Sequence, residues 1–183
     1  MADEKRLVAS PSQTIGPFLH VGFERQIELR TIGGSAAAQA ARLHLRIQVL
    51  DGAGDPIDDA LVEIWQAAPG GSDASSIGVR NWGRASTDAN GWCAFETVRP
   101  EPGVAEDGRG VAAHVNICVF ARGLLRHVFT RCYFAGDPAL AGDPVLDLVP
   151  SARRETLVAR LGDAGWTFQI RMQGSDETVF FDL

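Results

Sequence analysis

Residues that hold metal ions or attack substrates as nucleophiles are scarce in this sequence. The chain has one Tyr, four His and three Cys among 183 residues, and the histidines are scattered. Cys93, Cys118 and Cys132 show no Cys-x-x-Cys spacing, and the last two lie in apolar runs typical of buried free thiols. Ser86 and Ser151 have no His and acid at a spacing that predicts a catalytic triad. The sequence therefore offers few ligands from which a metal site could be built.

Charge and composition exclude several classes of protein. The net charge is −6 and the 17 Lys and Arg residues are spread thinly, whereas a nucleic-acid-binding protein needs a basic face. No Gly-x-Gly-x-x-Gly segment follows an expected strand, so no nucleotide site is predicted. The first ten residues mix acids and bases, and no apolar run approaches the ~20 residues that span a bilayer. We therefore expect a cytoplasmic protein.

Alternating apolar residues predict short strands as the elements that position the remaining candidates. In residues 43–50, Leu43, Leu45 and Ile47 alternate with polar residues, which is the period of a half-buried strand. The other expected strands are residues 60–66, 92–98, 114–121, 125–134, 166–172 and 177–183. A helical period is confined to residues 151–161, which follow Pro150 and end before Gly162.

Seven or eight short strands with turn residues between them favour a mainly β fold. We expect an antiparallel β-sandwich with irregular loops and one short helix. The length of 183 residues suits one domain, since single domains typically run to ~100–200 residues. Residues 1–183 are therefore expected to form a single domain, with residues 1–18 as an extended N-terminal arm.

Three segments resemble the intradiol ring-cleavage dioxygenases. They are PSQTIGPF (residues 11–18), EIWQA (63–67) followed by NGWCAFETVRP (90–100), and AHVNICVFARGLLRHVFTRCYFAGDP (113–138), joined near the C-terminus by RRETL and ETVFFDL. Their order and spacing together make the resemblance specific. It implies the β-sandwich of this family, ferric iron as its cofactor, and opening of a catechol ring by O2.

This chain departs from the family's iron-binding pattern at nearly every ligand. Catalytic chains of the family hold ferric iron with two tyrosinates and the two histidines of a His-x-His. Carried over residue by residue, the resemblance places Asp73 and Cys93 at the tyrosine positions, and His114 and Asn116 at the histidine positions. Only His114 matches a ligand. The resemblance therefore implies that these four positions form a degenerate site, with no catalytic residue and no iron in this chain alone.

The resemblance instead implies a subunit that binds substrate beside a homologous, iron-bearing beta subunit. The N-terminal arm would line the substrate pocket, and its matching residues are Thr14, Gly16, Pro17 and Phe18. Arg122, in the segment FARG, matches an arginine of the family, and its planar guanidinium suits a substrate carboxylate. The implied reaction converts protocatechuate and O2 to 3-carboxy-cis,cis-muconate in a higher-order alpha-beta oligomer, with Fe(III) on the beta subunit.

Two alternatives stay open at the level of the sequence. One is a stand-alone member of the family with a remodelled metal site, because Asp73, Cys93 and His114 are admissible ligands of zinc. The other is a non-enzymatic β-sandwich that acts as a binding module. Single residues also have simpler interpretations: Arg122 as a solvated arginine at a strand end, and His114 as a hydrogen-bonded core histidine.

Overall fold

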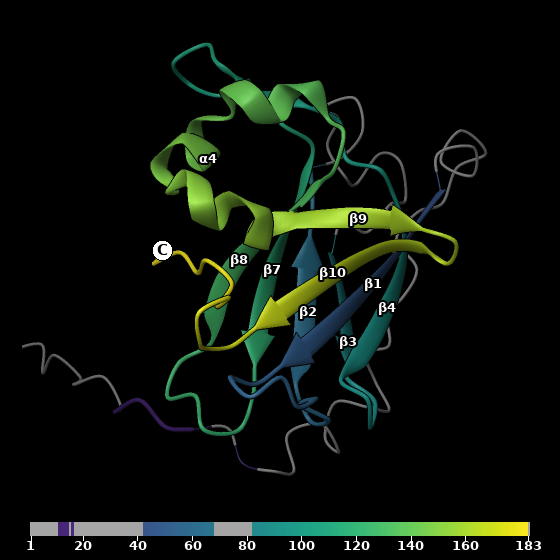
Figure 1. Cartoon of the computed structure of the whole chain (residues 1–183), viewed down its shortest axis with the longest axis vertical. Coiled ribbons are helices and arrows are strands. Elements are labelled where there is room, and N and C mark those ends of the chain that lie inside the picture. Colours follow the sequence, from purple (N-terminus) through teal and green to yellow (C-terminus); the bar gives the residue numbers. More distant parts are fainter. Residues whose placement is uncertain (1–10, 15, 17–41, 68–81, 183) are drawn as a thin grey trace, which may run out of the picture.

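Strands dominate the computed structural model, which describes residues 11–14, 16, 42–67 and 82–182 (Figure 1). The strands are β1 (Arg42–Leu50), β2 (Leu61–Trp65), β3 (Trp82–Ser86), β4 (Trp92–Val98), β5 (Gly103–Val104), β6 (Gly110–Val111), β7 (His114–Phe120), β8 (Val128–Phe134), β9 (Val158–Gly162) and β10 (Gly165–Arg171). Two 3-10 helices, η2 (Pro138–Gly142) and η3 (Ser151–Leu157), flank the short α-helix α4 (Pro144–Leu148). Figure 1 shows these helices gathered at one end of the strands.

Eight of the strands form a continuous sheet that folds over into two layers. Its order is β3-β2-β7-β8-β9-β10-β1-β4. We refer to β3, β2, β7 and β8 as layer one, and to β10, β1 and β4 as layer two. Strand β9 joins the layers, because it pairs in parallel with β8 and antiparallel with β10. At the other edge β3 lies against β4, so the sandwich is nearly closed into a barrel.

The core lies between the two layers, as expected for a sandwich. Strand β1 follows the predicted alternation, with Leu45, Ile47 and Val49 fully buried. Layer one contributes Ile64 of β2 and Ile117 of β7 to the same cluster. Because each layer buries alternate side chains, the residues between them project from the outer face. The β-sandwich prediction is confirmed, and the outer face of layer one is available for polar side chains.

The sheet is mixed rather than purely antiparallel. Strand β1 pairs in parallel with β10, and β8 pairs in parallel with β9 at Tyr133 and Phe134. The other pairings in the sheet are antiparallel among the described residues. Strand β3 is not predicted from the sequence, because Trp82–Ser86 contains a glycine and an arginine and lacks a run of large apolar residues.

The helix predicted at residues 151–161 is only partly correct. The segment Ser151–Leu157 is a 3-10 helix, and the chain then continues as strand β9. Pairing with the backbones of β8 and β10 outweighs the helical period of the sequence, since tertiary contacts routinely override local propensity. The strand predicted at residues 177–183 is wrong for the described residues 177–182, which make a single bridge between Phe181 and Phe129.

Candidate functional site

Arg122 lies in a tight turn directly after β7. The N–H of Leu124 donates a hydrogen bond of 3.3 Å to the carbonyl of Ala121, which closes the turn. Gly123, the third residue of the turn, has φ +85°, a conformation that glycine adopts without the strain imposed by a Cβ. Arg122 is the second residue, and 59% of its side chain is exposed. The turn therefore presents the guanidinium at the end of layer one.

Two aspartates face Arg122 across the sheet. The antiparallel register that pairs Leu61 with Phe120 places Asp59 opposite Arg122 when it is continued by two residues. The Nε of Arg122 contacts the Oδ2 of Asp59, and its Nη2 lies 3.8 Å from the Oδ1 of Asp58. The aspartates thus occupy the side edge of the guanidinium, formed by Nε and Nη2, and leave the end edge, formed by Nη1 and Nη2, for another acceptor.

The N-terminal arm reaches the same turn. The N–H of Gly123 donates a hydrogen bond of 3.0 Å to the Oγ1 of Thr14. Figure 1 shows the purple arm segment beside the connection between β7 and β8. Gly16 is exposed, whereas Pro17 and Phe18 lie outside the described residues. The structure therefore brings together Thr14 and Arg122, which the sequence had assigned to the substrate pocket from two distant segments.

His114 and Asn116 lie at the other end of β7, side by side on one face. Across the sheet they pair with Tyr133 and Arg131 of β8, respectively. The Nδ1 of His114 lies 2.8 Å from the carbonyl oxygen of Ala112, so this nitrogen carries the proton and donates. Burial lowers the pKa of His114 below its ordinary value, although the Ala112 carbonyl opposes the shift. His114 is therefore a neutral, hydrogen-bonded histidine.

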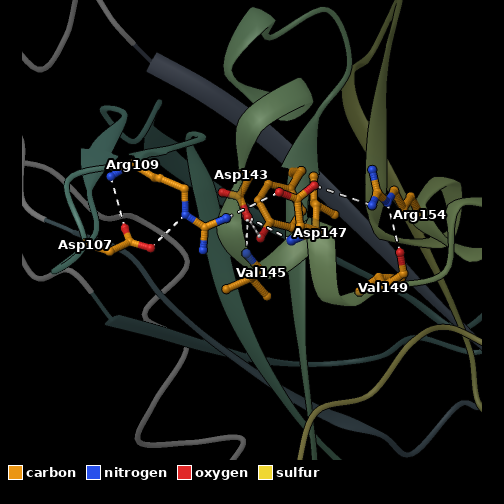
Figure 2. Close-up of polar contacts among 9 residues, drawn as sticks. Asp107, Arg109, Asp143, Val145, Asp147, Val149 and Arg154 are labelled. Atoms are coloured by element: carbon orange, nitrogen blue, oxygen red, sulfur yellow. Dashed lines mark hydrogen bonds and ion pairs between the residues drawn. The ribbon is translucent and has the colours of Figure 1, made fainter.

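A buried carboxylate supports this end of β7. Asp143 is fully buried and accepts hydrogen bonds from the N–H of Ala112 at 2.9 Å and from the hydroxyl of Tyr133 at 3.1 Å. It also caps α4, where it accepts from the N–H groups of Val145 and Leu146 (Figure 2). Burial raises the pKa of Tyr133 to about 12, so the only tyrosine of the chain is a protonated phenol.

A surface ion-pair network ties neighbouring segments to α4. Figure 2 shows Asp147 of α4 between two arginines, with its Oδ2 3.4 Å from the Nη1 of Arg109 and its Oδ1 3.5 Å from the Nη2 of Arg154. Arg109 also contacts Asp107 at 2.7 Å, and hydrogen bonds from Arg109 lower the pKa of Asp107. These exposed pairs hold the loop before β7 and the η3 helix around the Asp143 cap.

Cys93 and His114, two of the degenerate ligand positions, do not lie together. Cys93 of β4 belongs to the core cluster between the layers, whereas His114 projects from the outer face of layer one. Cys93 and His114 therefore cannot share a metal ion, which contradicts the remodelled site considered from the sequence. Asp73 lies outside the described residues. No group of three or more His, Cys, Asp or Glu residues that could hold a metal occurs in residues 11–14, 16, 42–67 and 82–182.

Two residues of this region escaped the sequence analysis. Asp59 could have been found from the pairing of its strand with the strand that precedes Arg122. Asp143 is signalled by the dipeptide Asp143-Pro144, since an Asp followed by Pro commonly begins a helix.

No helix of the described ranges is long and apolar enough to cross a membrane.

Comparison with known proteins places the chain among dioxygenases. A family model described as "Dioxygenase" matches residues 17–174. The protocatechuate 3,4-dioxygenase alpha chain of Burkholderia cepacia is 39% identical over 198 residues, which cover 97% of this chain and 98% of that one. The beta chain from the same organism is 33% identical over 155 residues, covering 72% of this chain and 64% of that one.

The fold is shared with solved structures of related enzymes. The crystal structure of catechol 1,2-dioxygenase from Pseudomonas arvilla C-1 matches with a TM-score of 0.61 and 23% identity, over 80% of this chain and 56% of that one. Because the family model spans most of the sequence and a relative above 30% identity spans nearly all of it, this chain belongs to the intradiol ring-cleavage dioxygenases, an iron-dependent family.

Proposed function

We propose that this chain is the alpha subunit of a protocatechuate 3,4-dioxygenase and lines the substrate pocket beside a homologous beta subunit. The similarity to an alpha chain over nearly the whole length supports this function. The holoenzyme would open the ring of protocatechuate with both atoms of O2 to give 3-carboxy-cis,cis-muconate. The whole chain would act as one domain, with residues 1–18 as its arm, in a cytoplasmic, higher-order alpha-beta oligomer.

The separation between Arg122 and His114 is the observation that carries this proposal. His114 begins β7 and Arg122 lies two residues past its end, and a strand rises by about 3.3 Å per residue, so roughly 25 Å separates them along the sheet. A ligand held by Arg122 and Thr14 is therefore remote from the degenerate ligand position at His114. This geometry suits a pocket completed by another chain, and we assign the Fe(III) to the beta subunit.

The contribution of this chain is to bind and orient the substrate. Protocatechuate carries a carboxylate, and the end edge of the Arg122 guanidinium can donate two parallel hydrogen bonds to it. Thr14 accepts a hydrogen bond from the N–H of Gly123 and so brings the arm to the turn that carries Arg122. We assign Gly16, Pro17 and Phe18 to the same pocket wall. Fixing the carboxylate orients the ring, and orientation alone lowers the barrier of the reaction on the partner subunit.

The test is Arg122→Ala in the complex co-expressed with the beta subunit. We expect kcat/KM for protocatechuate to fall by about 10- to 150-fold, because a hydrogen bond to a charged group contributes about 1.5–3 kcal/mol. Turnover of catechol, which lacks the carboxylate, should change little, and iron content should stay constant. Arg126→Ala is the matched control, because Arg126 is an exposed arginine of the same connection.

Four outcomes would contradict the proposal. Equal losses for protocatechuate and catechol, or no loss for either, would show that Arg122 does not bind the carboxylate. Failure of the two chains to form a ring-cleaving complex would refute the assignment as a subunit. Stoichiometric metal and turnover in the chain purified alone would favour a stand-alone enzyme.

A further inference from the structure

We propose that Asp59 is a positioning residue that holds the Arg122 guanidinium in the orientation required to receive a substrate carboxylate. This inference rests on the proposed function of Arg122 as the carboxylate anchor. It adds a residue that touches no substrate and acts through its contact with the Nε of Arg122.

The backbone on both sides of Asp59 is fixed by one buried threonine. Thr87 is only 6% exposed, and its hydroxyl donates a hydrogen bond of 2.7 Å to the carbonyl of Ile57. The same hydroxyl accepts a hydrogen bond of 3.0 Å from the N–H of Ala60. The N–H of Thr87 in turn donates to the carbonyl of Ala60 at 2.9 Å. Asp59 therefore projects from a turn whose two ends cannot shift independently.

The Asp59 side chain is buried where its neighbour Asp58 is not. The exposed fraction is 12% for the Asp59 side chain and 62% for that of Asp58. The Oδ1 of Asp59 is buried and has no hydrogen-bond partner within the described part of the chain, so the contact with Arg122 is the main compensation for its charge. A buried carboxylate binds its cation far more firmly than an exposed one, because water does not replace the lost contact.

The pair limits the orientations that Arg122 can adopt. Arginine has several rotatable bonds, and an exposed arginine without a fixed partner samples many rotamers. With Nε held by Asp59, the guanidinium samples fewer orientations and its end edge stays directed away from the aspartates. The turn itself is anchored by the hydrogen bond from Gly123 to Thr14. Asp59 therefore reduces the ordering that a bound carboxylate would otherwise impose on Arg122.

The charge of Asp59 has an opposite effect that an experiment can separate from its orienting effect. Asp58, Asp59 and Arg122 together carry a net charge of −1, since one arginine faces two carboxylates. This excess negative charge opposes an anionic substrate. Replacing Asp59 by Asn removes the charge and keeps an acceptor oxygen of the same shape, whereas replacing it by Ala removes both.

The test compares Asp59→Ala with Asp59→Asn in the complex with the beta subunit. We expect Asp59→Ala to lower kcat/KM for protocatechuate by about tenfold, the scale of one hydrogen bond to a charged group, and to leave catechol unaffected. Asp59→Asn should restore kcat/KM for protocatechuate to at least its original value. Asp55→Ala, at an exposed aspartate of the same connection between β1 and β2, is the matched control and should change it by less than about threefold. In an Arg122→Ala background, Asp59→Ala should have no further effect.

If Asp59→Ala lowers kcat/KM for catechol as much as for protocatechuate, the role of Asp59 is structural and the proposal is overturned. The same holds if Asp59→Ala lowers kcat/KM further in the Arg122→Ala background. A second measurement stands apart from the proposed function: the rate at which phenylglyoxal modifies Arg122, followed by peptide mass spectrometry. Both Asp59→Ala and Asp59→Asn should accelerate this modification, because each removes the charge paired with the guanidinium. An unchanged rate would show that Asp59 does not pair with Arg122, and it would refute the positioning role whichever residue binds the substrate carboxylate. Asp59→Asn keeps this test valid if Asp59→Ala fails to assemble.

Discussion

Removal of the Asp143 carboxylate should be among the most destabilising single changes in this chain. Its two oxygens accept hydrogen bonds from three backbone N–H groups and the Tyr133 hydroxyl. Loss of a helix cap costs about 0.5–2 kcal/mol. A buried donor left without an acceptor costs about 1–3 kcal/mol, and this applies to the N–H of Ala112. We therefore expect Asp143→Ala to lower the free energy of unfolding by about 1.5–5 kcal/mol, a large share of the ~5–15 kcal/mol typical of a domain.

The measurement is chemical denaturation at neutral pH, followed by the fluorescence of the four tryptophans. The midpoint should fall while the slope against denaturant stays constant, since the surface exposed on unfolding does not change. Asp143→Asn should lower the free energy of unfolding less than Asp143→Ala. Its amide oxygen can still accept from Tyr133, Val145 and Leu146, and only the N–H of Ala112 then faces the amide NH2.

Asp137 provides the matched control for Asp143. It also precedes a proline and begins a helix, but it accepts only one backbone hydrogen bond, from Ala139, beside a 3.5 Å ion pair with the partly exposed Arg99. Asp137→Ala should therefore cost about 1 kcal/mol, as for an ordinary cap. If Asp143→Ala costs no more than Asp137→Ala, the buried carboxylate does not hold the loop before β7, and the structural account of the His114 region is wrong.

Two further predictions follow from groups whose pKa values are shifted by burial. Because burial lowers the pKa of His114 in the folded chain, the unfolded chain takes up this proton first as the pH falls through about 6.5, so folded stability should decrease there until the lower pKa is reached. His114→Gln should flatten this part of the denaturation midpoint measured against pH, and an unchanged profile would contradict the buried neutral state. Burial also raises the pKa of the Cys118 thiol to about 12 and that of Cys132 as well, so neither should react with Ellman's reagent at pH 8 until denaturant is added. Rapid labelling of either residue in the folded chain would refute this.

Local patterns in the sequence predict those parts of the fold that depend on single strands. The alternation in β1 identifies its buried face, and Trp92–Val98 is a strand with the bounds expected for it. Strand β9 could not be predicted in this way, because the residues that form it complete a helical period. Its conformation depends on backbone groups of β8 and β10, which no local pattern encodes.

In the candidate site too, sequence patterns identify single residues but not the contacts between distant segments. The resemblance assigned Thr14 and Arg122 to one pocket, and the hydrogen bond from Gly123, the neighbour of Arg122, to Thr14 could not be read from either segment alone. For Cys93, in contrast, the motif predicted a role that the structure contradicts. Its motif suggested a ligand, but the phase of β4 directs its side chain into the core. Asp59 carried no motif at all, and only the pairing of β2 with β7 places it opposite Arg122.

The parallel pairing of β1 with β10 has a consequence for how the chain is made. Layer two places β1 between β4 and β10, so the first and last strands of the sheet along the chain are direct neighbours. Synthesis proceeds from the N-terminus, and β1 leaves the ribosome long before β10 exists. One edge of β1, with its apolar face, must therefore wait without its partner until Arg171 has been added. Contacts between such distant segments form slowly, so this edge and its apolar face stay uncovered for longer than those of strands with local partners.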